Sequence, residues 1–173
     1  MDAFVELLKL VLPAAAVLYA MYLTVKLFIN RDYQSKMIDI RNKTNEVVLP
    51  LRLQAYERIC LLLERISPNN LIIRLNDVSL SAKQLQALLL KEIREEFNHN
   101  LSQQLYMSDE AWNLAKIGME EVVSVINTSA AEMVDDAKGI DLAKRIFEKM
   151  LEKENDPIEN ALTFLKDEMR QFY

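Results

Sequence analysis

Glu96 and His99 lie three residues apart, and this Glu-x-x-His step is the arrangement in the sequence best suited to chemistry. On an α-helix, residues three apart lie on one face, so the carboxylate and the imidazole would be neighbours. In di-iron bundles, two helices each carry this step and two others each supply a glutamate. Glu57, Glu120 and Glu121 could supply carboxylates, but His99 is the only histidine. A metal protein or enzyme using Glu96 and His99 is therefore the alternative hypothesis, and a histidine bonded across a helix interface is favoured.

Other residue combinations that would identify an enzyme are missing from the sequence. The two glycines, Gly118 and Gly139, stand apart, so there is no phosphate-binding loop and no nucleotide fingerprint. The single cysteine, Cys60, has aliphatic neighbours and no histidine near it in sequence, which favours a small core residue over a nucleophile. We therefore expect a non-enzymatic protein without a cofactor.

Residues 98–106 are rich in uncharged polar side chains. Such groups either form a satisfied network inside the domain or face a partner. The candidates to face a partner are Asn100, Gln103, Gln104 and Tyr106. The internal network is the favoured interpretation, because Leu101 and Leu105 would set the same helix into the core.

Composition and helix-start signals predict an all-α fold. With 2 glycines and 4 prolines in 173 residues, the sequence lacks the turn residues that a sheet protein needs. A capping box beginning at Ser81, an N-cap at Ser108 and Pro157 in a first turn divide residues 50–173 into successive helices. Short connections between them predict an up-and-down bundle of four or five helices.

The apolar periodicity also places the ends of these helices. The expected helices cover residues 51–66, 82–105, 109–134, 141–151 and 157–169. Pro50 is expected either to bend the preceding helix or to open the next one. Residues 71–75 are compatible with a turn of helix or with a strand-like linker.

The N-terminal part of the sequence predicts a transmembrane helix. Residues 10–25 carry no charge and lie inside an apolar stretch that covers residues 4–29. At about 1.5 Å per residue, this stretch would cross a hydrocarbon core of about 30 Å. It is apolar all round and has tyrosines and a lysine toward one end, which favours a membrane anchor over a buried core helix or a cleaved signal. We therefore expect an anchor in residues 1–30, in contact with lipid through residues 4–29.

The flanking charges predict the orientation of this anchor. Five Lys/Arg residues fall within residues 26–43, whereas Lys9 is the only one before the span. Basic residues accumulate on the cytoplasmic side, so the N-terminus is expected outside. This gives a single-pass protein of the cytoplasmic (inner) membrane, with a juxtamembrane helical connection in residues 31–49 and a cytoplasmic bundle in residues 50–173.

The connection carries an apolar stripe at spacings of three and four. Its members are Met37, Ile40, Thr44, Val47 and Leu51. This is about two heptads, fewer than a coiled-coil assignment requires, so a solvated or partner-covered helix is favoured.

Charge limits the partners. The chain has a formal net charge of −5, and the excess of acid lies in residues 50–173. Nucleic acid is therefore not expected as a partner, because phosphate contacts need a basic face. The function expected is that of a membrane-anchored, non-enzymatic protein-interaction or scaffold subunit, with an unidentified protein or a second copy as partner.

Two stretches carry a resemblance to known sequences. Residues 49–71 begin Leu-Pro-Leu-Arg-Leu-Gln-Ala-Tyr-Glu-Arg, and residues 96–106 read Glu-Phe-Asn-His-Asn-Leu-Ser-Gln-Gln-Leu-Tyr, followed by Ala111-Trp112. They resemble an uncharacterised family of bacterial single-span membrane proteins with a cytoplasmic all-helical domain, which implies this architecture and no site. The chain is also similar in layout to the peripheral-stalk b subunit of rotary ATP synthases. It departs from that family in having prolines at positions 50, 68 and 157, which interrupt a single long helix.

Overall fold

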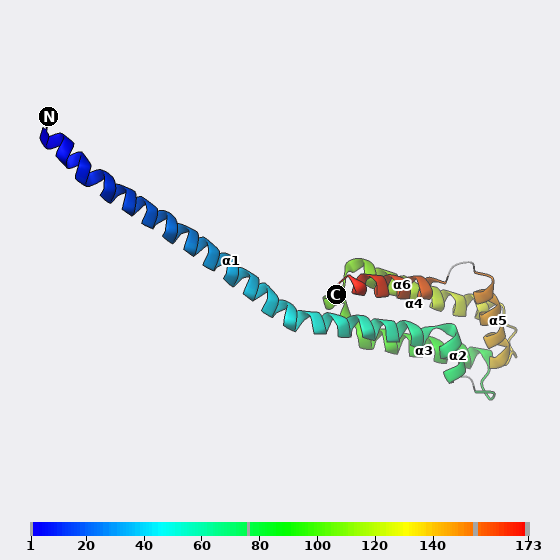
Figure 1. Ribbon diagram of the computed structural model, residues 1–173. Coiled ribbons are helices and arrows are strands. Elements are labelled where there is room, and N and C mark those ends of the chain that lie inside the picture. Colours follow the sequence, from blue (N-terminus) through cyan, green and yellow to red (C-terminus); the bar gives the residue numbers. More distant parts are fainter. Residues whose placement is uncertain (1, 76, 154–155, 172–173) are drawn as a thin grey trace. The chain divides into compact units, whose positions relative to one another are not determined.

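The computed structural model describes residues 2–75, 77–153 and 156–171. Side chains are described from residue 9 onward, except at residues 10, 11, 14, 41, 42, 44 and 45. Within these residues the structure consists of helices (Figure 1). They are α1 (Asp2–Ile66), α2 (Pro68–Leu75), α3 (Ala82–Asn100), the 3-10 helix η1 (Leu101–Tyr106), α4 (Asp109–Ala131), α5 (Gly139–Leu151) and α6 (Pro157–Arg170). The all-α class is confirmed.

The chain divides into two units, residues 1–48 and residues 49–173. All described residues of the first unit belong to α1, which continues through Pro50 to Ile66. A new helix therefore does not open at Pro50, contrary to one of the two outcomes expected there. Proline can lie inside a helix at the loss of one backbone hydrogen bond, because it has no N–H to donate.

The predicted transmembrane helix is contradicted by the structure. Among the residues that the structure describes, no helix is long and apolar enough to cross a membrane. The anchor in residues 1–30, its lipid contact through residues 4–29 and the single-pass inner-membrane localisation are therefore corrected. Of that segment, Met1 and the side chains of residues 2–8, 10, 11 and 14 lie outside the described part.

The second unit is a helical bundle, but the predicted four or five helices are too few: its described residues include the end of α1, α2 to α6 and the 3-10 helix η1. In Figure 1, residues 49–66 of α1 are followed by α3, α4 and α6 in up-and-down order, with α2 and α5 at one end. The helix α4 packs against α3, α5 and α6. Trp112 of α4 stacks on Phe97 of α3, with ring centroids 5.3 Å apart. Fully buried side chains from five helices form one core, among them Ile59, Leu63, Leu89, Ile93, Ile126, Leu142, Ile146 and Leu165.

Local hydrogen bonds confirm two of the predicted helix starts. At α3, the N–H of Gln84 donates to the Ser81 Oγ (3.3 Å), and the N–H of Ser81 donates to the Gln84 Oε1 (2.9 Å). At α6, the N–H of Ile158 donates to the Asp156 Oδ1 (2.9 Å). These bonds satisfy N–H groups that have no partner within the helix itself.

Several helix ends differ from the prediction. The helix α3 ends at Asn100 rather than near residue 105, α4 ends at Ala131, and α5 begins at Gly139. Residues 71–75, left open by the sequence, belong to α2. Leu101 and Leu105 are 39% and 78% exposed, so the expectation that they enter the core is wrong. In the 3-10 winding of η1, with three residues per turn, residues four apart no longer share a face.

A close backbone approach joins the starts of α3 and α5. The N–H of Gly139 donates to the Leu80 carbonyl (2.8 Å), and the N–H of Ala82 donates to the Ala137 carbonyl (2.9 Å). A Cβ at Gly139 would lie 3.0 Å from the Leu80 carbonyl oxygen. At Gly118, inside α4, the nearest atom would be 3.5 Å away, which is ordinary contact. Only the first of these positions therefore depends on glycine for space.

We expect Gly139→Ala to lower the free energy of unfolding by about 1 kcal/mol, because the added methyl group crowds the backbone of residue 80. Gly118→Ala is the matched control and should raise it by roughly 0.5–1 kcal/mol, because alanine is favoured over glycine inside a helix. Urea denaturation followed by circular dichroism measures both changes. A stabilised Gly139→Ala variant would contradict the close approach.

Candidate functional site

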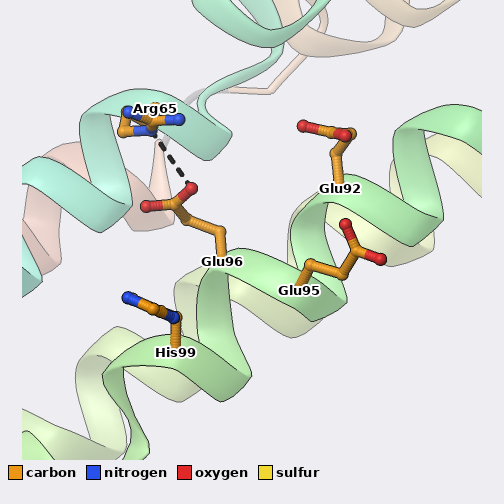
Figure 2. A pocket seen from close by; sticks show the side chains of 5 residues that line it. All are labelled: Arg65, Glu92, Glu95, Glu96 and His99. Carbon is orange, nitrogen blue, oxygen red and sulfur yellow. Dashed lines mark ion pairs between the residues drawn. The ribbon is translucent and has the colours of Figure 1, made fainter.

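A surface groove of about 380 Å³ lies between α1 and α3 in the second unit. It is lined by Arg65, Glu92, Glu95, Glu96 and His99. Figure 2 shows Glu96 pointing toward Arg65, while His99 projects from α3 one turn further along. This groove brings together the two residues of the Glu-x-x-His step, on the neighbouring helix positions that the spacing predicts.

Every glutamate of the groove has an oppositely charged partner. The pairs are Arg65–Glu96 (N···O 3.2 Å), Arg74–Glu92 (3.1 Å) and Lys91–Glu95 (3.7 Å). The first pair joins α1 to α3, and the second joins α2 to α3. Partly exposed pairs of this kind typically contribute about 0–1 kcal/mol each. The groove therefore acts mainly as an electrostatic contact between helices.

The geometry does not support a metal site at Glu96 and His99. Across the described residues, no group of three or more His, Cys, Asp or Glu side chains is arranged to hold a metal ion. Glu57, Glu120 and Glu121 thus complete no such group with them. Because the Glu96 carboxylate already binds a guanidinium, a metal would have to displace that partner.

We expect neither Zn²⁺ nor Fe²⁺ to change the melting temperature of the full chain, because a ligand stabilises only a fold that binds it. Glu96→Gln should lower the free energy of unfolding by no more than about 1 kcal/mol, since the lost ion pair is partly exposed. Calorimetry with and without metal measures the first effect, and urea denaturation the second. A metal-dependent rise in melting temperature that both Glu96→Gln and His99→Ala remove would restore the metal hypothesis.

The polar run after His99 makes local hydrogen bonds. Asn100 is buried, and its Nδ2 donates to the Glu96 carbonyl in the same helix (2.9 Å). Gln103 donates through Nε2 to the hydroxyl of its neighbour Ser102 (3.3 Å). These bonds satisfy two side chains that the sequence offered as partner-facing candidates, and they do so without reaching across the bundle.

The other two candidates lie on the surface of η1. Gln104 and Tyr106 are exposed, and so is the neighbouring Leu105. The Tyr106 carbonyl accepts a hydrogen bond from the Nε of Arg52 in α1 (3.1 Å), which holds η1 against that helix. A partner-facing role for Gln104 and Tyr106 stays a prediction.

A polar junction that the sequence did not reveal ties α1, α4 and α6 together. The Ser108 Oγ accepts from the N–H of Ala111 (3.1 Å) and donates to the Glu168 carboxylate (2.9 Å). The N–H of Ser108 donates to the buried Tyr56 hydroxyl (3.3 Å). Burial raises the pKa of Tyr56, an effect partly offset by the Ser108 N–H and reinforced by the Glu168 carboxylate. Ser108 was recognisable as an N-cap, but no sequence signal connects it to a residue 60 positions away.

We expect Ser108→Ala to lower the free energy of unfolding by about 1–2 kcal/mol, because it removes the N-cap of α4 and the hydroxyl that donates to Glu168. Ser124→Ala, on the exposed face of the same helix, is the matched control and should cause no loss. Urea denaturation at neutral pH distinguishes the two. Equal stability of both variants would show that the junction contributes nothing.

Cys60 lies half-buried in α1, in a groove that also contains Leu53, Lys166 and Met169. Burial raises the pKa of its thiol, with a smaller opposing effect from Lys166. A nucleophilic cysteine needs the thiolate near neutral pH, so this environment does not activate it.

The first unit presents a different kind of surface. Large apolar side chains are exposed along most of residues 12–48, including Leu18, Leu27 and Phe28, which are 67%, 69% and 71% exposed. The described residues of this unit all belong to α1, so no second element among them covers these side chains. Contiguous exposed apolar surface beyond a few hundred Å² marks interaction sites. The sequence assigned residues 4–29 to lipid and residues 31–49 to a solvated or partner-covered connection. Among the described residues, the structure leaves residues 12–48 as the most extensive candidate for an interaction surface.

A family model matches residues 2–172, and its description is "Family of unknown function (DUF7935)". The chain belongs to this family. No curated protein and no solved structure matches the chain. The expected relationship to an uncharacterised family is thereby confirmed, but the match supports neither a bacterial source nor a membrane span.

Proposed function

We propose that this chain is a non-enzymatic protein-interaction subunit that binds another protein chain through the helix of its first unit. The observation that carries the proposal is the exposure of large apolar side chains along residues 12–48. Each Å² of apolar surface removed from water contributes about 25 cal/mol, so a partner that covers this helix gains substantial stabilisation.

The two units differ in whether their apolar side chains are buried. The bundle of the second unit buries its apolar side chains in one core made by its own helices. A helix in water draws most of its stability from packing an apolar face against another element. The described residues of the first unit form a single helix, so no second described element of that unit packs on its apolar side chains.

The chemistry of the second unit supports a non-enzymatic role. Its acidic groove consists of carboxylates that are already paired with arginine or lysine. Its thiol has a raised pKa, and its serine at the start of α4 serves as a cap. The groove glutamates, Cys60 and Ser108 therefore have structural roles within the fold, which supports a role other than catalysis for them.

We expect the double variant Met37→Glu and Val47→Glu to lose its partner, because two exposed apolar side chains of the first unit become charged. Burying side chains of this size contributes about 1.5–3 kcal/mol each, which corresponds to roughly a tenfold or greater loss of affinity per position. The matched control is Ile73→Glu, which replaces a 72% exposed side chain in the second unit and should keep the partner. Affinity capture of the full chain from its own cells, with the mass of the recovered complex determined by light scattering, measures the outcome.

Circular dichroism checks that the variants remain helical, which is expected because glutamate is a good helix former. Recovery of wild type, control and double variant alike as lone monomers would refute the proposed function. The same holds if the double variant keeps the partner of the wild type.

A further inference from the structure

One side of the first-unit helix carries an apolar seam, defined here as Tyr33, Met37, Ile40 and Val47. Their spacings of four, three and seven place them in the two inward-facing columns of a heptad repeat, in which the position seven residues after Met37 is the polar Thr44. All four side chains are exposed. A second helix can therefore lie along the seam and cover it.

Charges are sorted by sign around this seam. Lys36 and Lys43, seven residues apart, lie in a column that flanks the seam. Asp32, Asp39 and Glu46, also seven apart, lie in a column turned further away from it, at 3.6 residues per turn. Lys36 forms an ion pair with Asp32 (2.8 Å), but both side chains are largely exposed and remain open to exchange with another carboxylate. The edge of the seam that carries Lys36 and Lys43 is thus basic.

The seam also has a hollow of the right kind. Ile40, Lys43 and Val47, with Val48, line a shallow depression of about 400 Å³. The first three are at positions i, i+3 and i+7, which are corners of the diamond into which a side chain of a facing helix inserts. The depression is shallow and lies on the seam.

A second copy of this chain does not complement these charges. In an antiparallel pair, the lysine column would face itself, and like charges at such positions are destabilising. In a parallel pair, it would face the opposite flank, where positions 34, 41 and 48 of the sequence hold no carboxylate. The complementary partner is a helix with acidic flanks.

We propose that the seam binds an amphipathic helix of a different protein, whose apolar stripe is flanked by glutamate or aspartate. This inference rests on the proposed function and names the class of partner. The apolar stripe supplies affinity, and the charge columns select the partner against helices with basic flanks.

The test uses two synthetic helical peptides of about four heptads with leucine in both inward-facing columns. One has glutamate and the other lysine in both flanking columns. Titrated against the labelled full chain and followed by fluorescence anisotropy, the glutamate peptide should bind at least about tenfold more tightly at low salt, and the difference should shrink at high salt. Equal affinity of the two peptides, or no binding of either, would overturn the acidic partner.

Charge reversal provides the matched comparison. The double variant Lys36→Glu and Lys43→Glu should prefer the lysine peptide, whereas Lys144→Glu with Lys166→Glu, which reverses two exposed lysines of the second unit, should keep the wild-type preference. An unchanged preference in the first double variant would also count against the proposal.

Two further results separate this inference from the proposed function. If Met37→Glu and Val47→Glu abolish capture of the cellular partner but wild type does not distinguish the peptides, protein binding stands and the acidic class is wrong. If the full chain alone sediments as a dimer that Val47→Glu dissociates, the occupant of the seam is a second copy.

Discussion

Burial of apolar side chains is the constraint on which both units depend. Within the second unit, Ile59 and Leu63 of α1 are fully buried in a core shared with α3, α4, α5 and α6. In the first unit, the same helix carries Leu27 and Phe28 as exposed side chains. One helix thus contains a segment whose apolar side chains are buried and a segment whose apolar side chains are exposed, and the exposed segment is the basis of the proposed partner.

Polar contacts then fix how the second unit closes. Ser108 joins three helices through its hydroxyl and its backbone N–H, and Gly139 allows the starts of α3 and α5 to approach. Burying a polar group without a partner costs about 1–3 kcal/mol, so these contacts discriminate against alternative packings. The described helices of the bundle therefore bury their apolar side chains in a core of their own.

The features predicted from the sequence are those whose cause is local. The capping box at Ser81 needs only Gln84, three residues away, and the start of α6 needs only Asp156 and the following proline. The fold class follows from the same kind of pattern. The Ser108–Glu168 bond was beyond prediction because its two residues meet only after the bundle has formed.

Two predictions from the sequence pattern were wrong for physical reasons: the burial of Leu101 and Leu105, and the transmembrane helix. Leucines at 101 and 105 fit an α-helical stripe, but the change to 3-10 winding moved them to the surface. An uncharged run is compatible with more than one apolar environment, and here the pattern was assigned to lipid although no described helix meets the requirements of a span. An apolar surface favours contact with some apolar environment, but apolarity alone does not distinguish lipid from another protein. That distinction needs other features of the sequence.

Charge arrangement is that other signal, and it has opposite meanings in the two units. Glu96 and His99 share a helix face, which suggested a metal site in the acidic groove. A metal site also needs ligands from other helices. Instead, Arg65 and Arg74 of the neighbouring helices form ion pairs with Glu96 and Glu92. Along the first unit, Lys36 and Lys43 face an apolar seam that no element of that unit covers. Charges paired across helices stabilise a contact already made, whereas the lysines beside the seam are the basis of the proposed choice of partner.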